Sequence, residues 1–201
     1  MEKNENKWSV RDVISAVLLS AVLIVIQVVV TMVTMANHFI SMVLSVGIIT
    51  LLCGPVYCLL IGRVRKRGVS LVYMTILGLI YLLMGNWYLL IYFILVGILC
   101  EAILWKKGSF QSPWRITAAW TTASLLYNGI NLLPIWFFWD TYYRFAVSSG
   151  MEQAYIDSYR NYYTSPKWLI FILLFSTLCG FIGSRIGSGL MSRHFKKAGV
   201  L

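Results

Sequence analysis

The chain alternates between long apolar stretches and short polar gaps. An apolar stretch of about 20 residues is long enough for an α-helix to cross the hydrocarbon core of a bilayer. The pattern predicts an all-α integral membrane protein, in which six transmembrane helices form one bundle and residues 1–201 form a single membrane domain. The six apolar segments lie at about residues 12–35, 42–61, 69–84, 87–105, 114–136 and 167–191.

The third and fourth segments form one apolar stretch that is interrupted only by Gly85-Asn86. A continuous helix over this stretch would be about 50 Å long. The hydrocarbon core of a bilayer is only about 30 Å thick. We therefore expect a tight hairpin at Gly85-Asn86-Trp87.

The basic residues are distributed unevenly between alternate gaps. Fourteen of the 17 Lys and Arg residues lie before the first segment, in the gaps after the second and fourth, or near the end of the chain. Only Arg144, Arg160 and Lys167 lie in the other gaps. Short cytoplasmic loops retain Lys and Arg, so we expect both termini on the cytoplasmic side of a bacterial inner (cytoplasmic) membrane.

Composition agrees with this interpretation. Hydrophobic residues make up 59% of the chain and charged residues 12%, which is far more apolar than a soluble domain. The formal net charge of +10 is spread over the gaps of a membrane bundle. A nucleic-acid-binding protein would instead carry its basic residues on one face of a soluble domain. We therefore expect the lipid bilayer, and no nucleic acid, as a partner.

The cysteines give no sign of a disulfide or a metal site. All four lie inside apolar segments, where a thiol behaves as a small hydrophobic side chain. We expect neither a bound metal nor a cofactor. The four residues are Cys53, Cys58, Cys100 and Cys179.

Residues 137–166 form the only long gap between apolar segments, and they are rich in aromatic side chains. A loop of this length in a compact domain usually has a function. Tyr155, Tyr159 and Tyr162 follow the i, i+4, i+7 spacing of one helix face. This spacing predicts a short amphipathic helix within the loop.

The three gaps that we expect outside the cell must meet at one end of the bundle. They combine aromatic walls with a few polar groups, which is the usual composition of a small-molecule site. We expect a substrate site there. Its candidate residues are Asn37, His38, Asn86, Trp87, Asn128, Asn131, Trp136, Trp139, Tyr142, Tyr143, Tyr155 and Tyr159.

Several of these residues have a second interpretation. Trp and Tyr are enriched at membrane interfaces, so the aromatic loop is either a binding wall or an interfacial anchor. Asn128 and Asn131 lie within an apolar segment, where an amide must bond another helix or face a cavity. His38 is either a ligand contact or a structural hydrogen-bonding residue.

Signatures of catalysis are missing from the sequence. The chain has no Walker A, HExxH or GxSxG motif, and each of these carries a known enzymatic chemistry. Glu101 is an acid near the end of an apolar segment, without an acidic or His partner in another segment. We expect neither an enzyme nor a proton-coupled pump.

Four stretches resemble one known family: KWSVRDVISAVLLSAVL, LLCGPVYCLLIGRVRKRGV, GILCEAIL and SGLMSRHFKKAGVL. They are similar to the MptD-type (Trep-Strep) S components of energy-coupling-factor transporters, over nearly the whole chain. The resemblance implies a six-helix subunit that captures a small molecule with its outer loops. It also implies two kinds of partner, a transmembrane T component and two cytoplasmic ATPase subunits.

The resemblance further implies a docking motif for the T component on the first helix. The family motif is two alanines four residues apart, and the nearest match here is Ala16 and Ser20. A small-x-x-x-small pair lets another helix approach closely. Packing inside the bundle is the alternative role of this pair.

The sequence thus favours a substrate-binding (S) subunit of an ATP-driven importer, for a micronutrient of the vitamin, cofactor or metal-chelate class. The competing hypothesis is a membrane scaffold or assembly protein that binds another protein through its aromatic external loop.

Overall fold

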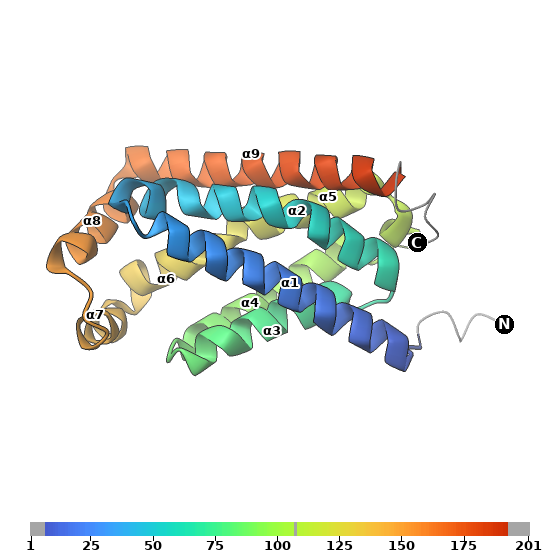
Figure 1. The fold of residues 1–201 in the computed structure, drawn as a ribbon, viewed down its shortest axis with the longest axis horizontal. Helices are drawn as coiled ribbons and strands as arrows, with labels where there is room; N and C mark the ends of the chain where they lie inside the picture. Colours follow the sequence, from blue (N-terminus) through green and yellow to red (C-terminus); the bar gives the residue numbers. More distant parts are fainter. Residues whose placement is uncertain (1–6, 107, 193–201) are drawn as a thin grey trace.

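The computed structural model describes residues 7–106 and 108–192, and every regular element among them is a helix. Figure 1 shows long helices that run along a common direction, with short helices closing one end. The long helices are α1 (Val10–Thr34), α2 (Ser45–Val64), α3 (Val69–Leu83), α4 (Trp87–Leu104), α5 (Pro113–Tyr127) and α9 (Pro166–Leu190). The short elements are η1 (Ile40–Leu44), η2 (Ser109–Gln111), α6 (Gly129–Phe137), α7 (Trp139–Ser148) and α8 (Gln153–Thr164).

All six predicted segments are helical in the structure, but they differ in length and hydropathy, and therefore in whether they could span a membrane. Four helical stretches are long and apolar enough to span one: Val10–Thr34, Ile40–Val64, Trp87–Leu104 and Pro166–Leu190. α3 is apolar but has only 15 residues.

The segment predicted as one helix at residues 114–136 is broken, and this corrects the sequence prediction. α5 ends at Tyr127 and α6 begins at Gly129. The Asn128 amide group donates to the carbonyl oxygens of Ser124 at 3.4 Å and Leu125 at 3.0 Å. A side chain that binds nearby carbonyls competes with the backbone ladder, so the helix is interrupted here.

Local signals in the sequence set several helix ends. α1 begins at a capping box, in which the Ser9 hydroxyl accepts from the Asp12 N–H while the Asp12 carboxylate accepts from the Ser9 N–H. This exchange satisfies two donors that a helix start leaves unpaired. Pro113 and Pro166 occupy the first turns of α5 and α9, where a missing N–H costs nothing.

The most extensive helix contact joins α2 and α9, which lie side by side in Figure 1. A Cβ placed on Gly54 would lie 2.4 Å from the backbone of Gly183, and one on Gly183 would lie 2.3 Å from the Leu51 carbonyl oxygen. Only glycine permits this approach. The sequence pattern of small residues in α9 predicts such packing, and Gly180 and Gly187 also make close contacts, whereas Gly189 has nothing within 4 Å.

The centre of the bundle is filled by aromatic residues and one amide. The Gln27 amide group donates to the Tyr73 hydroxyl at 2.6 Å, and the Tyr127 hydroxyl donates to the Gln27 carbonyl oxygen at 2.8 Å. Trp120 is buried beside them, with its ring 4.6 Å from that of Tyr57. The amide therefore links α1, α3 and α5 through hydrogen bonds inside the apolar core.

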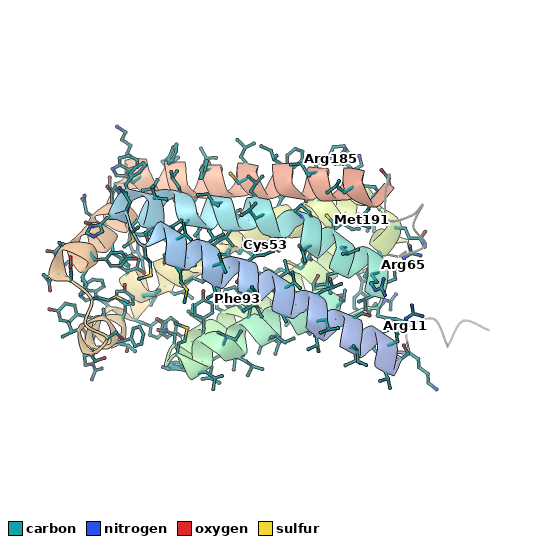
Figure 2. The ribbon with its side chains drawn as sticks, in the orientation of Figure 1. Arg11, Cys53, Arg65, Phe93, Arg185 and Met191 are labelled. Carbon is teal, nitrogen blue, oxygen red and sulfur yellow. The ribbon has the colours of Figure 1, made fainter. Side chains whose placement is uncertain are left out.

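The two ends of the bundle differ in chemistry. In Figure 1 the connections after α1 and α3, together with α7 and α8, lie at one end, while α1 begins and α9 ends at the other. Figure 2 shows Arg11 and Arg65 at that second end. We call these the aromatic end and the basic end.

Candidate functional site: an aromatic cap at one end of the bundle

The predicted external loop is almost entirely helical in the structure. α8 confirms the expected amphipathic helix, and α7 is a second helix that the sequence analysis did not predict. Together with the rings that they contribute, α7 and α8 form a layer that we call the aromatic cap. Its ring residues are Trp139, Tyr142, Tyr143, Tyr155, Tyr159, Tyr162 and Tyr163.

Tyr159 is at the centre of the cap and is 3% exposed. Its ring lies 4.8 Å from that of Tyr142 and 5.2 Å from that of Tyr163. Trp139 extends the cluster, with its ring 6.0 Å from those of Tyr142 and Tyr143. These distances are typical of stabilising aromatic pairs, so α7 and α8 hold each other through their rings.

Tyrosine hydroxyls tie the cap to the bundle. The Tyr159 hydroxyl donates to the Asn131 carbonyl oxygen of α6 at 2.6 Å. The Tyr163 hydroxyl donates to the Met42 carbonyl oxygen of η1 at 2.8 Å, and it accepts from the Asn131 amide group at 2.7 Å. Asn131 of α6 therefore bonds two tyrosines of the cap.

The burial of these phenols keeps them protonated. Desolvation raises the pKa of Tyr142, Tyr159 and Tyr163 above the ordinary value for tyrosine, because a phenolate would lose its hydration. Tyrosine is already protonated near neutral pH, so the Tyr159 and Tyr163 hydroxyls that bond the bundle remain donors there. The cap is held by neutral hydrogen bonds that mild changes of pH leave intact.

An open cleft lies where the end of α1 meets α8. The His38 ring packs edge-on against the Tyr155 ring at 5.3 Å, and the Ser158 hydroxyl lies 3.4 Å from Nδ1 of His38. The cleft has a volume of about 310 Å³, and Met35 and Glu152 also line it. This arrangement offers a ring, an imidazole and a carboxylate to a ligand.

A second cleft lies where α6 meets α7. It has a volume of about 360 Å³, and Trp139, Asp140 and Arg144 line it. The Arg160 guanidinium of α8 lies 5.6 Å from the Trp139 ring of α7. An aromatic wall with both charge signs at its rim suits a polar ligand that also has a flat apolar face.

The hairpin between α3 and α4 lies at the edge of the cap. Asn86 is buried, and its side-chain oxygen accepts from the Tyr88 hydroxyl at 3.0 Å. The Tyr88 ring stacks on Phe138 at 4.2 Å, and the Trp87 ring meets Phe138 at 5.7 Å. The structure thus brings the hairpin to the start of α7, as the sequence predicts, although Asn86 bonds within its own hairpin.

Two candidates lie apart from the cap. Asn128 is fully buried between α5 and α9, where its amide group donates to the Ser176 hydroxyl at 2.7 Å. Asn128 therefore bonds another helix, one of the two roles that the sequence leaves open, while its side-chain oxygen has no hydrogen-bond partner among the described residues. Asn37 is exposed, and its side-chain oxygen accepts from the Ile40 N–H at 3.1 Å. Trp136, another candidate, is 58% exposed on α6 and lines the second cleft.

The proposed docking pair on α1 is also placed differently from expectation. Ala16 is 1% exposed and Ser20 is 0% exposed, so both face the interior of the bundle. Their small side chains serve the packing of α1 on its own neighbours. This corrects the expectation that the pair presents a free face to another subunit.

Two residues in the bundle have roles that the sequence analysis did not assign. Gln27 joins three helices in the core, and its signal was an amide in an otherwise apolar segment. Glu101 accepts from the Gly68 N–H at 2.9 Å and the Ser70 N–H at 2.7 Å. Both of its carboxylate oxygens therefore cap the start of α3, which gives this acid a structural role.

Comparison with known proteins places the chain at the level of a family. Residues 10–197 match the family model described as hypothetical bacterial integral membrane protein (Trep_Strep). No curated protein and no solved structure matches the chain.

Proposed function

We propose that this chain, which belongs to the Trep_Strep family of bacterial integral membrane proteins, is the non-catalytic S subunit of an energy-coupling-factor importer. In this role it spans the cytoplasmic membrane six times, with both termini inside. It captures a micronutrient of the vitamin, cofactor or metal-chelate class outside the cell. A T component and two ATPase subunits then drive uptake.

The observation that carries this proposal is the aromatic cap with its two flanking clefts. The cap lies opposite the basic end of the bundle. It is at the outer end if the Lys and Arg residues of the basic end lie in the cytoplasm. Clefts of about 310 and 360 Å³ are large enough for small-molecule ligands. Capture from outside requires a site at this end of the bundle.

The residues of the cap suggest how a ligand would be held. Trp139 and the exposed edge of Tyr143 offer flat apolar surfaces to a planar group. Arg144 and Asp140 at the rim offer charged contacts to polar substituents. The buried tyrosines beneath them keep α7 and α8 in position, so their role is support and not contact.

The first experiment identifies the ligand. Mass spectrometry of small molecules released from the gently purified protein should find one compound in stoichiometric amount. With that compound, Tyr143→Ala and Trp139→Ala should each weaken binding at least tenfold, or by about 1.4 kcal/mol.

Trp114→Ala is the matched control, because Trp114 is an exposed tryptophan that precedes Arg115 at the basic end. Its affinity should equal that of the unchanged protein. If the loop variants keep full affinity while only their expression falls, the cap is an interfacial anchor and the proposal fails.

A scaffold that binds another protein is the second candidate, and one observation favours it. Phe137 is 76% exposed and Trp87 is 52% exposed beside the cap, which leaves apolar surface at the rim. A photo-crosslinking residue at position 137 distinguishes the two functions. A single stoichiometric protein adduct, in a preparation without any bound small molecule, would support the scaffold.

A further inference from the structure

A cavity lies at the basic end, far along the bundle from the aromatic cap. Its volume is about 410 Å³, and it lies where α2 ends, α5 begins and α9 ends. Figure 2 shows Arg65 and Met191, which both line it, at this end of the molecule. The polar residues that line it are Arg65, Gln111, Ser188 and Ser192. Its apolar lining includes Phe110 and Met191.

Arg65 occupies a backbone conformation that favours glycine. It follows the last residue of α2 with φ of 51°, in the left-handed region. Glycine adopts this conformation without the steric cost that a side chain adds. The Arg65 Nε donates to the Gly62 carbonyl oxygen at 2.6 Å, and both residues line the cavity. The guanidinium is thereby fixed next to the cavity.

Arg65 is the only charged residue among the described residues that line the cavity. Among the described residues that line it there is no Asp or Glu. A cavity with a fixed guanidinium, hydroxyl and amide donors, and no carboxylate favours an anion, and Arg is well suited to phosphate oxygens.

Two tryptophans indicate the depth of this cavity in a membrane. Trp105 and Trp114 are 61% and 64% exposed, and Trp114 follows Pro113 of the cavity wall. Arg67 lies 4.7 Å from the Trp105 ring and Arg185 lies 4.3 Å from the Trp114 ring. Exposed Trp with nearby cations is typical of headgroup depth, so the cavity opens at the level of lipid phosphates.

We propose that this cavity binds a phosphate ester that carries an apolar group, namely the headgroup of an anionic membrane lipid. Arg65 binds the phosphate oxygens, with Ser188, Ser192 and Gln111 as further donors, and Phe110 and Met191 contact the glycerol and the first carbons of the acyl chains. A free phosphate ester shares the charged part of this chemistry but lacks the apolar part. The inference does not depend on the proposed transport function.

The test uses the full-length protein in detergent micelles and native mass spectrometry. Phosphatidylglycerol is titrated against phosphatidylcholine with the same acyl chains, and glycerol 1-phosphate is titrated alone. We expect one phosphatidylglycerol to be retained at least tenfold more tightly than phosphatidylcholine. Glycerol 1-phosphate should bind at least tenfold more weakly than the lipid; equal binding would assign the cavity to a free phosphate ester and overturn the lipid source.

Two variants locate the site, and a third is the control. Arg65→Gln should weaken phosphatidylglycerol retention at least fivefold. Gln111→Trp keeps every cation but fills the cavity from an exposed position, and it should have the same effect. Arg11→Gln removes one positive charge from the same end (Figure 2) without touching the cavity, so it should leave retention unchanged.

The pattern among these variants decides the proposal. Equal losses in Arg11→Gln and Arg65→Gln would mean that the basic end attracts anionic lipid without a specific site. Full retention in Gln111→Trp would place the lipid outside the cavity. Absence of preferential phosphatidylglycerol binding in the unchanged protein would also overturn the inference.

Discussion

Single polar side chains in the bundle determine how neighbouring helices are joined. Gln27 is 4% exposed and Glu101 is 8% exposed, and each bonds two groups from other parts of the chain. Gln27 binds Tyr73 and Tyr127, whereas Glu101 binds the backbone at the start of α3. A buried polar group stabilises a fold only when its partners are present, so these contacts are sensitive to substitution.

Replacing Glu101 with Ala should remove the cap of α3. The Gly68 and Ser70 N–H groups would lose their acceptors in a part-buried place. We expect the free energy of unfolding, measured by denaturing-detergent titration, to fall by about 1–3 kcal/mol. Glu152→Ala is the control, because Glu152 is exposed, and it should change that free energy by less than about 0.5 kcal/mol. Equal stabilities of the two variants would contradict the capping role.

Replacing Gln27 with Leu should leave the Tyr73 hydroxyl without its donor in the apolar core. The expected loss of unfolding free energy is again about 1–3 kcal/mol. Removing the orphaned hydroxyls in the variant Gln27→Leu, Tyr73→Phe, Tyr127→Phe should restore part of this loss, because no polar group is then left unpaired. A triple variant that is less stable than Gln27→Leu would show that the two hydroxyls still stabilise the fold without Gln27, which would contradict this explanation.

At the scale of elements, small residues decide which helices touch. Gly183 brings α9 against the backbone of α2, while Gly189 in the same helix contacts nothing within 4 Å. The two glycines therefore differ in their tolerance of a methyl group, although the sequence pattern treats them alike.

Gly183→Ala should separate α2 from α9, because its Cβ would lie 2.3 Å from the Leu51 carbonyl oxygen. We expect a loss of stability within the range of about 1–3 kcal/mol that overpacking a core costs. Gly189→Ala has open space and should be neutral or slightly stabilising, since alanine is the better helix former. Thermal unfolding of both variants, followed by circular dichroism, measures the difference. Similar melting temperatures would show that the backbone contact is absent in the membrane.

Ala16→Trp tests where α1 packs. The side chain points into the bundle, so a bulky ring should destabilise the fold and reduce the yield of monodisperse protein by gel filtration. Val17→Trp is the matched control, because Val17 is 47% exposed on the outer face of the same helix. A well-folded Ala16→Trp variant would restore the idea of a free docking face.

The sequence predicted the elements better than their partners. Apolar length located the six helical segments, since membrane helices need long apolar runs. It missed the break at Asn128, because that break depends on side-chain bonds to Ser124 and Leu125 that hydropathy does not register. The Ala16–Ser20 spacing indicated a close helix approach, but spacing alone does not say which helix approaches.

For the molecule as a whole, the separation of aromatic and basic ends is the feature from which we predict its orientation in a membrane. The cap residues Trp139 and Tyr143 were predicted as a group because the three aromatic-end gaps had to meet. The bond of Asn128 to Ser176 on α9 was not predicted, because the pairing of these two residues is a property of the folded bundle only.

We predict that the basic end lies in the cytoplasm, because short cytoplasmic loops retain Lys and Arg. In intact cells, a membrane-impermeant maleimide should label Asp157→Cys in α8 and spare Gln111→Cys in η2. The native cysteines are buried, so they give little background. Permeabilised cells should show labelling at both positions, which checks that both thiols are accessible. Labelling of Gln111→Cys alone in intact cells would reverse the orientation and remove the aromatic cap from the outer face.

The hydroxyl contacts of Tyr159 and Tyr163 have a kinetic consequence. They tie α8 to α6 and to η1 at once, so α8 leaves the bundle only when both bonds break in the same event. A molecule that binds beneath α8 must wait for that opening. Its observed association rate would rise with concentration at first and then level off at the opening rate of α8, whereas binding in the open clefts would stay proportional to concentration.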